Sequence, residues 1–233
     1  MKPKSWIQSA NLAIEGIIYS VRTQRHMRYH LIAALSVLIL SLLLNISRIE
    51  FIFLSLAIIL VLVTEMLNTA IEATVDMIER GFNPQAKIVK DIGAGVVLVA
   101  SVGALTLAYF ILYPALRRAL EHGSLRIVKA PADVVAFVSL SAVIIIVIII
   151  KALVGKGEPL RGGMPSGHAA VSFSILAAAV SMSVSWTVKA LFLLCAVLVS
   201  LSRWWSGIHK PDEVLAGMLI GSCVTFLFFW IFT

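Results

Sequence analysis

Long apolar runs separated by short polar segments constrain this sequence more than any other feature. Of its 233 residues, 60% are hydrophobic and only 13% are charged, and the mean hydropathy is +1.01. A soluble domain of this size is about half apolar and about a quarter charged, whereas a helix of about 20 apolar residues spans a bilayer. The composition therefore predicts an all-α integral membrane protein and excludes an ordinary soluble domain.

Seven apolar runs, taken with their flanks, are interpreted as transmembrane helices. They cover residues 31–44, 51–78, 90–113, 133–150, 169–186, 188–201 and 214–232. Before them, residues 5–28 mix apolar with polar and charged side chains, which predicts an amphipathic helix in the membrane interface. We therefore expect about seven transmembrane helices plus one interfacial helix. Cys195 and Cys223 both lie in apolar runs and are interpreted as packing residues.

The composition changes most clearly between Pro114 and Ala132, a segment rich in Arg, Lys and His. We interpret 114–132 as a basic linker between a domain at 1–113 and a second domain at 133–233. When the spans are counted, most of the 19 Lys and Arg residues fall on the side of the N-terminus. This distribution predicts a cytoplasmic N-terminus, and it explains the net charge of +7 without a nucleic-acid partner.

A stripe of four polar side chains follows the apolar run 51–63 without a break. Its members are Glu65, Asn68, Glu72 and Asp76. At about 100° per residue they fall within about 80° of one helix face. Ionisable groups at membrane depth are costly and indicate function; alternatively, the helix leaves the bilayer here and the acids are simply solvated.

The chemistry of this stripe fits phosphoryl transfer from a nucleotide. A carboxylate can take a proton from a hydroxyl, and further carboxylates can hold Mg²⁺ against phosphate oxygens. Lys90, next to Asp91, can neutralise phosphate charge, and positioning with charge neutralisation is most of the catalysis in such reactions. The sequence lacks a G-x-x-x-x-G-K-[ST] loop, which excludes the P-loop arrangement.

The stripe, residues 86–95 and the upstream segment Arg22–Arg28 together resemble the prokaryotic diacylglycerol kinase family, which includes the undecaprenol kinases. The resemblance covers about residues 5–113. It implies a three-span homotrimer that phosphorylates a lipid hydroxyl, of undecaprenol or diacylglycerol, with MgATP.

The same resemblance implies roles for individual residues. Glu65 would be the catalytic base, Asn68 would position the substrates and Glu72 would be a metal ligand. The residues implied for nucleotide binding are Asp76, Lys90 and Asp91. Gln24 stands where family members often carry a metal-binding glutamate, and its amide oxygen can coordinate Mg²⁺ but carries no charge.

The second half carries two short polar segments between apolar runs, Met164–His168 and Ser202–Glu213. Taken alone, Ser166 could simply cap the following helix, and a lone buried histidine is more often structural than catalytic. By span counting, however, both segments return to one membrane face. A helix start and several cations can bind a phosphate there, while one histidine attacks phosphorus and another protonates the leaving oxygen.

These segments resemble the type-2 phosphatidic acid phosphatase superfamily over about residues 133–233. The resemblance implies His209 as the nucleophile, His168 as the general acid and no cofactor for this half. The residues implied for phosphate binding are Lys151, Ser166, Gly167 and Arg203. Glu158-Pro159 replaces the Arg-Pro of the first motif, and Arg161 can supply the missing cation. The spacing of the superfamily's third motif favours Glu213 as the carboxylate that orients the nucleophile, with Asp212 as the alternative.

The two resemblances together predict a bifunctional membrane lipid enzyme of the bacterial inner membrane. A kinase and a phosphatase acting on one monophosphate would form a futile cycle. The preferred substrates are therefore undecaprenol and undecaprenyl pyrophosphate, which both yield undecaprenyl phosphate. Phosphatidic acid and phosphatidylglycerol phosphate are alternative phosphatase substrates. Two further alternatives are a phosphatase whose first half is a trimeric scaffold, and a transporter or membrane-organising protein without catalysis.

Overall fold

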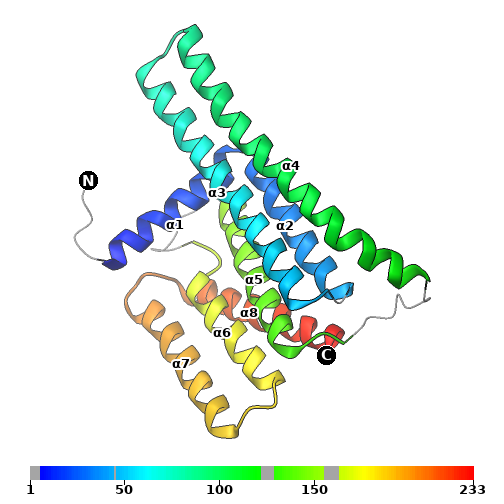
Figure 1. Cartoon of the computed structure of the whole chain (residues 1–233). Coiled ribbons are helices and arrows are strands. Elements are labelled where there is room, and N and C mark those ends of the chain that lie inside the picture. The colour runs from blue at the N-terminus through cyan, green and yellow to red at the C-terminus, as the bar shows by residue number, and fades with distance from the viewer. Residues whose placement is uncertain (1–5, 45, 122–128, 155–162) are drawn as a thin grey trace. The chain divides into compact units, whose positions relative to one another are not determined.

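The computed structural model describes residues 6–44, 46–121, 129–154 and 163–233, which form eight helices (Figure 1). The helices are α1 (Trp6–Thr23), α2 (Arg25–Leu43), α3 (Arg48–Ile78), α4 (Pro84–Glu121), α5 (Ala132–Val154), α6 (Gly167–Ser181), α7 (Trp186–Trp205) and α8 (Pro211–Phe232). No strand is present in these four stretches. The all-α class predicted from the sequence is confirmed.

Six of the helices in the described part of the chain are long and apolar enough to cross a membrane, namely α2, α3, α4, α5, α7 and α8. The protein is thus a multi-pass membrane protein with one long apolar helix fewer than the seven expected. Of the seven expected spans, the one that is too short corresponds to α6. This helix has 15 residues and is about 22 Å long, shorter than a hydrocarbon core of about 30 Å. The span expected at 169–186 ends early, at Ser181, and Trp186 already begins α7, whose N-cap Ser185 accepts from the backbone N–H of Val188.

The interfacial helix expected at 5–28 is interrupted, because Gln24 adopts an extended conformation between α1 and α2 (φ −101°, ψ 120°). The side chain of Gln24 donates a hydrogen bond to Glu72 on α3 instead of lying along a continuous helix surface. Residues 25–28 therefore belong to α2 and not to the amphipathic helix.

Two other expected boundaries are wrong. The second span, expected to begin at residue 51, begins at Arg48 with α3, because Ser47 and Glu50 form a capping box there. The third span does not end at Tyr113, since α4 continues through Pro114 to Glu121. A proline removes one helix hydrogen bond, and the turns after it contain a 2.6 Å ion pair between Arg117 and Glu121.

The chain forms two compact units. Thr23–Val128 forms one of them, here called the α2–α4 unit, in which α3 packs against both α2 and α4. Figure 1 shows α3 and α4 as a long antiparallel hairpin. Met1–Arg22 and Lys129–Thr233 form the other, here called the α5–α8 unit. In that unit α5, α6 and α8 pack on one another, and α7 packs mainly on α6.

The close contact between α6 and α8 depends on two glycines. A Cβ atom added to Gly217 would lie 2.3 Å from the backbone oxygen of Ser166, and one on Gly221 would lie 2.1 Å from a backbone oxygen of α6. One turn further along, the hydroxyls of Ser174 and Thr225 form a buried 2.7 Å hydrogen bond. Gly-x-x-x-Gly lets membrane helices approach closely, and here it holds the start of α6 against the start of α8.

Replacing Gly221 by alanine is expected to destabilise the protein by about 1–3 kcal/mol, because the added methyl group overpacks a backbone contact that cannot move aside. The thermal melting temperature in detergent micelles measures this effect. Gly103→Ala is the matched control, since nothing lies within 4 Å of a Cβ there and alanine favours helix. Equal melting temperatures for the two variants would contradict the role given to Gly221.

Candidate active sites

The first candidate site is centred on His209, which lies in the loop between α7 and α8. Only 3% of the surface of this residue is exposed. Its Nδ1 lies 2.8 Å from Oε2 of Glu213 in the first turn of α8. An ionised carboxylate can only accept hydrogen bonds, so Nδ1 of His209 donates and Nε2 keeps its lone pair. Nε2 is buried without a hydrogen-bond partner in the described residues. One nitrogen is held in place and the other is left to react.

Glu213 is itself fixed by two backbone groups. Its Oε1 accepts from the N–H of Gly163 at 3.0 Å, and its Oε2 accepts from the N–H of Lys210 at 3.2 Å. Gly163 has a φ of 89°, in the left-handed region that favours glycine, and its carbonyl accepts from Nζ of Lys151 at 3.3 Å. Glu213 therefore contacts His209 through this carboxylate, whereas Asp212 is exposed.

Three further polar atoms in this unit are buried without a partner among the described residues; one is Oγ of Ser200, and the other two lie in the segments Met164–His168 and Ser202–Glu213. These two are Oγ of Ser166 and Nε of Arg203. Ser166 is the N-cap residue of α6, yet its side chain makes no capping hydrogen bond, so the capping interpretation is wrong for this serine. A buried polar atom without a partner is costly, and a phosphate oxygen would satisfy both of these donors.

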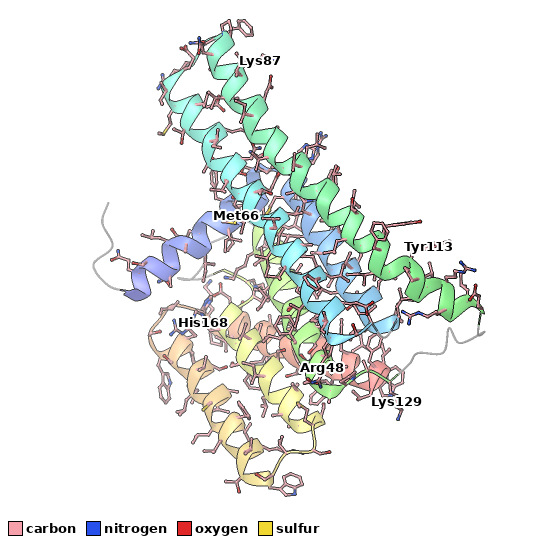
Figure 2. The ribbon with its side chains drawn as sticks, viewed as in Figure 1. Arg48, Met66, Lys87, Tyr113, Lys129 and His168 are labelled. Carbon is pink, nitrogen blue, oxygen red and sulfur yellow. The ribbon has the colours of Figure 1, made fainter. Side chains whose placement is uncertain are left out.

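His168 is the second residue of α6, and Figure 2 shows it at the N-terminal end of that helix. Burial lowers the pKa of His168 below its usual value, and the cations Arg203 and Lys151 and the protonated form of His209 act in the same direction. Gly167 precedes His168 as the first residue of the helix. Of the predicted phosphate-binding residues, Arg161 lies outside the described residues.

Burial lowers the pKa of His209 below its usual value of about 6.5, because imidazolium is poorly solvated there. The hydrogen bond to Glu213 favours the charged form and opposes this shift, while the charges of Lys151 and Arg203 reinforce it. His209 is therefore mostly neutral at pH 7, which is the form with a lone pair on Nε2.

The second candidate site lies on α3 in the α2–α4 unit. Glu65 and Asn68 are buried, with exposures of 3% and 8%, so solvation by water does not explain these two members of the stripe. Gly93 of α4 lies directly against Asn68, because a Cβ added to Gly93 would lie 2.5 Å from Oδ1 of Asn68. That oxygen has no hydrogen-bond partner in the described part of the chain.

The charged residues near the end of α3 are exposed and paired. Asp76 forms an ion pair with Lys90 of α4, and Asp91 forms one with Lys87 at 2.6 Å. The first pair joins α3 to α4 and the second lies one turn apart on α4. Such exposed pairs contribute about 0–1 kcal/mol to stability, so these side chains can exchange partners at little cost.

The carboxylate of Glu72 accepts two amide hydrogen bonds. Nε2 of Gln24 donates to Oε2 at 2.9 Å, and Nδ2 of Asn68 donates to Oε1 at 3.0 Å. Among the residues described, no three His, Cys, Asp or Glu side chains form a cluster that could hold a metal ion. Mg²⁺ is usually held by one or two carboxylates, with substrate phosphates and water completing its shell. Glu72 and a neighbouring amide oxygen fit that minimal donor set.

A cavity of about 200 Å³ lies in the same unit, and its lining along α3 extends to Leu62, three residues before Glu65. It is lined almost entirely by apolar side chains of α2, α3 and α4, and Val61 in its wall lies one helical turn before Glu65. The hydroxyl of Ser101, also in the wall, is buried without a partner in the described chain. An apolar chain with a polar end fits such a lining.

Comparison with known proteins identifies two families of lipid-modifying membrane enzymes in this chain. The prokaryotic diacylglycerol kinase family model matches residues 11–112, and the PAP2 superfamily model matches residues 97–233, more than half of the chain. The chain belongs to both families, which confirms both resemblances. It is therefore a membrane lipid enzyme with a segment of a lipid kinase family and a segment of a lipid phosphatase superfamily.

Curated relatives fall in the same two groups. A diacylglycerol kinase of Synechocystis sp. is 32% identical over 123 residues, which cover 50% of this chain and 70% of that protein. An undecaprenol kinase of Bacillus subtilis is 41% identical over 101 residues, covering 43% of this chain and 82% of that protein. An undecaprenyl-diphosphatase of Sulfolobus acidocaldarius is 39% identical over 70 residues, 30% of this chain and 34% of that protein. No solved structure matches the chain significantly.

Sequence reasoning missed residues whose role depends on backbone contacts. Gly163 joins Lys151 to Glu213 through its own carbonyl and N–H groups, and no side-chain pattern marks such a residue. The Gly217–Gly221 pair could have been found, because the four-residue spacing of small residues in an apolar helix is a recognised contact motif.

Proposed function

We propose that the protein both phosphorylates undecaprenol with MgATP and dephosphorylates undecaprenyl pyrophosphate, so that both reactions yield undecaprenyl phosphate. The names of two relatives, an undecaprenol kinase and an undecaprenyl-diphosphatase, support this pair of substrates. The proposed domains are 1–113 for the kinase, 114–132 for a basic linker and 133–233 for the phosphatase. We further propose a homotrimer in the bacterial inner membrane with a cytoplasmic N-terminus.

The observation that carries the phosphatase proposal is the buried Nε2 of His209, unpartnered in the described residues while Nδ1 is held by Glu213. Nε2 would attack phosphorus and form a phosphohistidine, while His168 would protonate the leaving oxygen. Water activated by His168 would then release inorganic phosphate and regenerate His209. Lys151, Arg161, Ser166, Gly167 and Arg203 would bind the phosphate oxygens, and Glu213 would stabilise the charge that develops on the ring.

The kinase proposal rests on the buried carboxylate of Glu65, one helical turn from an apolar cavity lined by Val61 and Leu62. The lipid chain would enter the cavity with its hydroxyl at Glu65, which would accept the proton as the oxygen attacks the γ-phosphorus of ATP and ADP leaves. Asn68 would position the hydroxyl, and Asp76, Lys90 and Asp91 would contact the nucleotide. Glu72, with the amide of Gln24, would hold Mg²⁺. When bound, that ion would neutralise charge on the transferred phosphoryl group.

One observation favours the alternative of a phosphatase with a non-catalytic first half. Both oxygens of Glu72 already accept from amides, and Gln24 adds no charge to attract a cation. A substrate panel with and without ATP and Mg²⁺ tests the proposal. Phosphate release from phosphatidylglycerol phosphate but not from a prenyl pyrophosphate would contradict the substrate assignment.

The pH dependence of phosphate release is expected to follow His209. Because its pKa is lowered by burial, the neutral nucleophile persists to lower pH, and the fall of kcat/KM on the acid side should lie below about pH 6.5, whereas loss of the proton from His168 causes the fall on the alkaline side. Glu213→Gln removes the anion that raises this pKa, so the acid limb should move to still lower pH. kcat should also drop by about 100-fold or more, because the tautomer is no longer fixed.

Asp212→Asn is the matched comparison for Glu213→Gln, since it neutralises the exposed carboxylate next in sequence. Both variants are measured from about pH 5 to about pH 8 with a short-chain prenyl pyrophosphate. A larger loss of kcat in Asp212→Asn than in Glu213→Gln would assign the orienting role to Asp212 instead.

A further inference from the structure

Arg22 belongs by sequence to one family and by structure to the other half of the protein. It lies within residues 11–112, which match the diacylglycerol kinase model. Yet it ends the segment of α1 that groups with Lys129–Thr233 in the α5–α8 unit. Its Nη2 donates a hydrogen bond to the backbone oxygen of Lys151 at 3.0 Å.

The acceptor of this hydrogen bond is a helix-terminal carbonyl. α5 ends at Val154, so the carbonyl of Lys151 lies in the last turn of the helix. A cationic side chain that donates to this carbonyl also interacts favourably with the negative end of the helix dipole. Arg22 therefore fixes the turn that carries the Lys151 side chain.

From Lys151, a continuous series of contacts leads to the nucleophile. Nζ of Lys151 donates to the carbonyl of Gly163, and the N–H of Gly163 donates to Glu213. Glu213 in turn holds Nδ1 of His209. A change at Arg22 thus reaches His209 through four polar contacts, the first of which is the hydrogen bond from Arg22 to the carbonyl of Lys151.

We propose that Arg22 is a positioning residue of the phosphatase site, so that this site is complete only with α1 from the kinase-family segment. The proposal rests on the phosphatase function proposed above. Arg22 acts through Lys151 and the backbone of Gly163 and does not itself touch the phosphate. Without it, the last turn of α5 is held less firmly and Lys151 is displaced from the phosphate oxygens.

The test measures phosphate release from a short-chain prenyl pyrophosphate by the full-length protein in detergent. Arg22→Ala is expected to lower kcat by about tenfold, because misplacing a binding group by about 1 Å costs that much or more. Arg22→Lys should recover part of the loss, since it keeps the charge and one donor. Arg117→Ala is the matched control, as Arg117 is exposed and pairs only along α4 with Glu121.

A double-mutant cycle separates positioning from general destabilisation. If Arg22 acts through Lys151, adding Arg22→Ala to Lys151→Met should cost less than about twofold, whereas independent effects would multiply. The proposal would be overturned if the loss of kcat in the double variant equalled the product of the two single losses, or if kcat were unchanged in Arg22→Ala. Because Gln24 lies only two residues away and contacts Glu72, kinase activity is measured in parallel. An equal loss of both activities would also overturn it.

A second measurement does not depend on the lipid substrate. Orthovanadate is expected to raise the melting temperature of the wild-type protein and of Arg117→Ala, and to raise it less in Arg22→Ala. Wild-type protein that releases no phosphate from any lipid would contradict the proposed function alone. Equal stabilisation of Arg22→Ala and wild type by orthovanadate would contradict the role of Arg22.

Discussion

Replacing His209 by alanine is expected to reduce phosphate release from a prenyl pyrophosphate by about a thousandfold or more, because the reaction loses its nucleophile. The same variant should keep its ATP-dependent kinase activity, since His209 belongs to the α5–α8 unit and Glu65 to the other. Phosphate release and transfer from radiolabelled ATP to lipid are measured on the same preparation, so the kinase reaction controls for folding.

His168→Ala provides a contrast that distinguishes the two histidines. A general acid that also activates water for the second step should leave a phosphoenzyme that accumulates when it is removed. Acid-labile labelled protein is therefore expected in His168→Ala and absent in His209→Ala. Labelling of the His209→Ala variant would show that another side chain is the nucleophile.

Replacing Glu65 by glutamine is expected to lower kinase activity by about 100-fold to 10,000-fold, because an amide of the same shape cannot accept the proton of the lipid hydroxyl. The phosphatase activity of this variant should stay unchanged. The kinase assay is best run in the His209→Ala background, so that the phosphatase half cannot remove the labelled product.

Glu121→Gln is the matched control, because it replaces an exposed carboxylate whose ion pair in the described part of the chain is with Arg117, on the same helix. Equal kinase rates in the Glu65→Gln and Glu121→Gln variants would show that Glu65 is not the catalytic base. Absence of labelled lipid in the His209→Ala background, at any Mg²⁺ concentration, would instead support a first half that serves only as a scaffold.

Much of the fold could be predicted because hydrophobic burial in a bilayer leaves few choices. An apolar run of sufficient length with satisfied backbone groups must be helical, and this alone gives the class and the approximate position of each span. The boundaries were harder, because single contacts decide them. Gln24 leaves the helix as its side chain bonds to Glu72, and the hydropathy of residues 5–28 contains no sign of that distant partner.

Local sequence patterns define the reactive groups that this chain carries. His209 and Glu213 are only four residues apart in the sequence, and the spacing from Glu65 to Asp76 aligns the polar stripe on one helix face. Local periodicity fixes such short-range relations, and the motifs that identify both families are short-range patterns of the same kind.

Which of these groups meet depends on how the helices pack. Ser166 makes no capping hydrogen bond and its backbone lies against Gly217 of α8, and Arg22 reaches the carbonyl of Lys151 across 129 positions of sequence. Contacts over such separations depend on how helix backbones pack, and packing is a property of complementary surfaces that no local pattern encodes. The identity of the reacting groups is therefore a sequence property, whereas their pairing is a property of the folded chain.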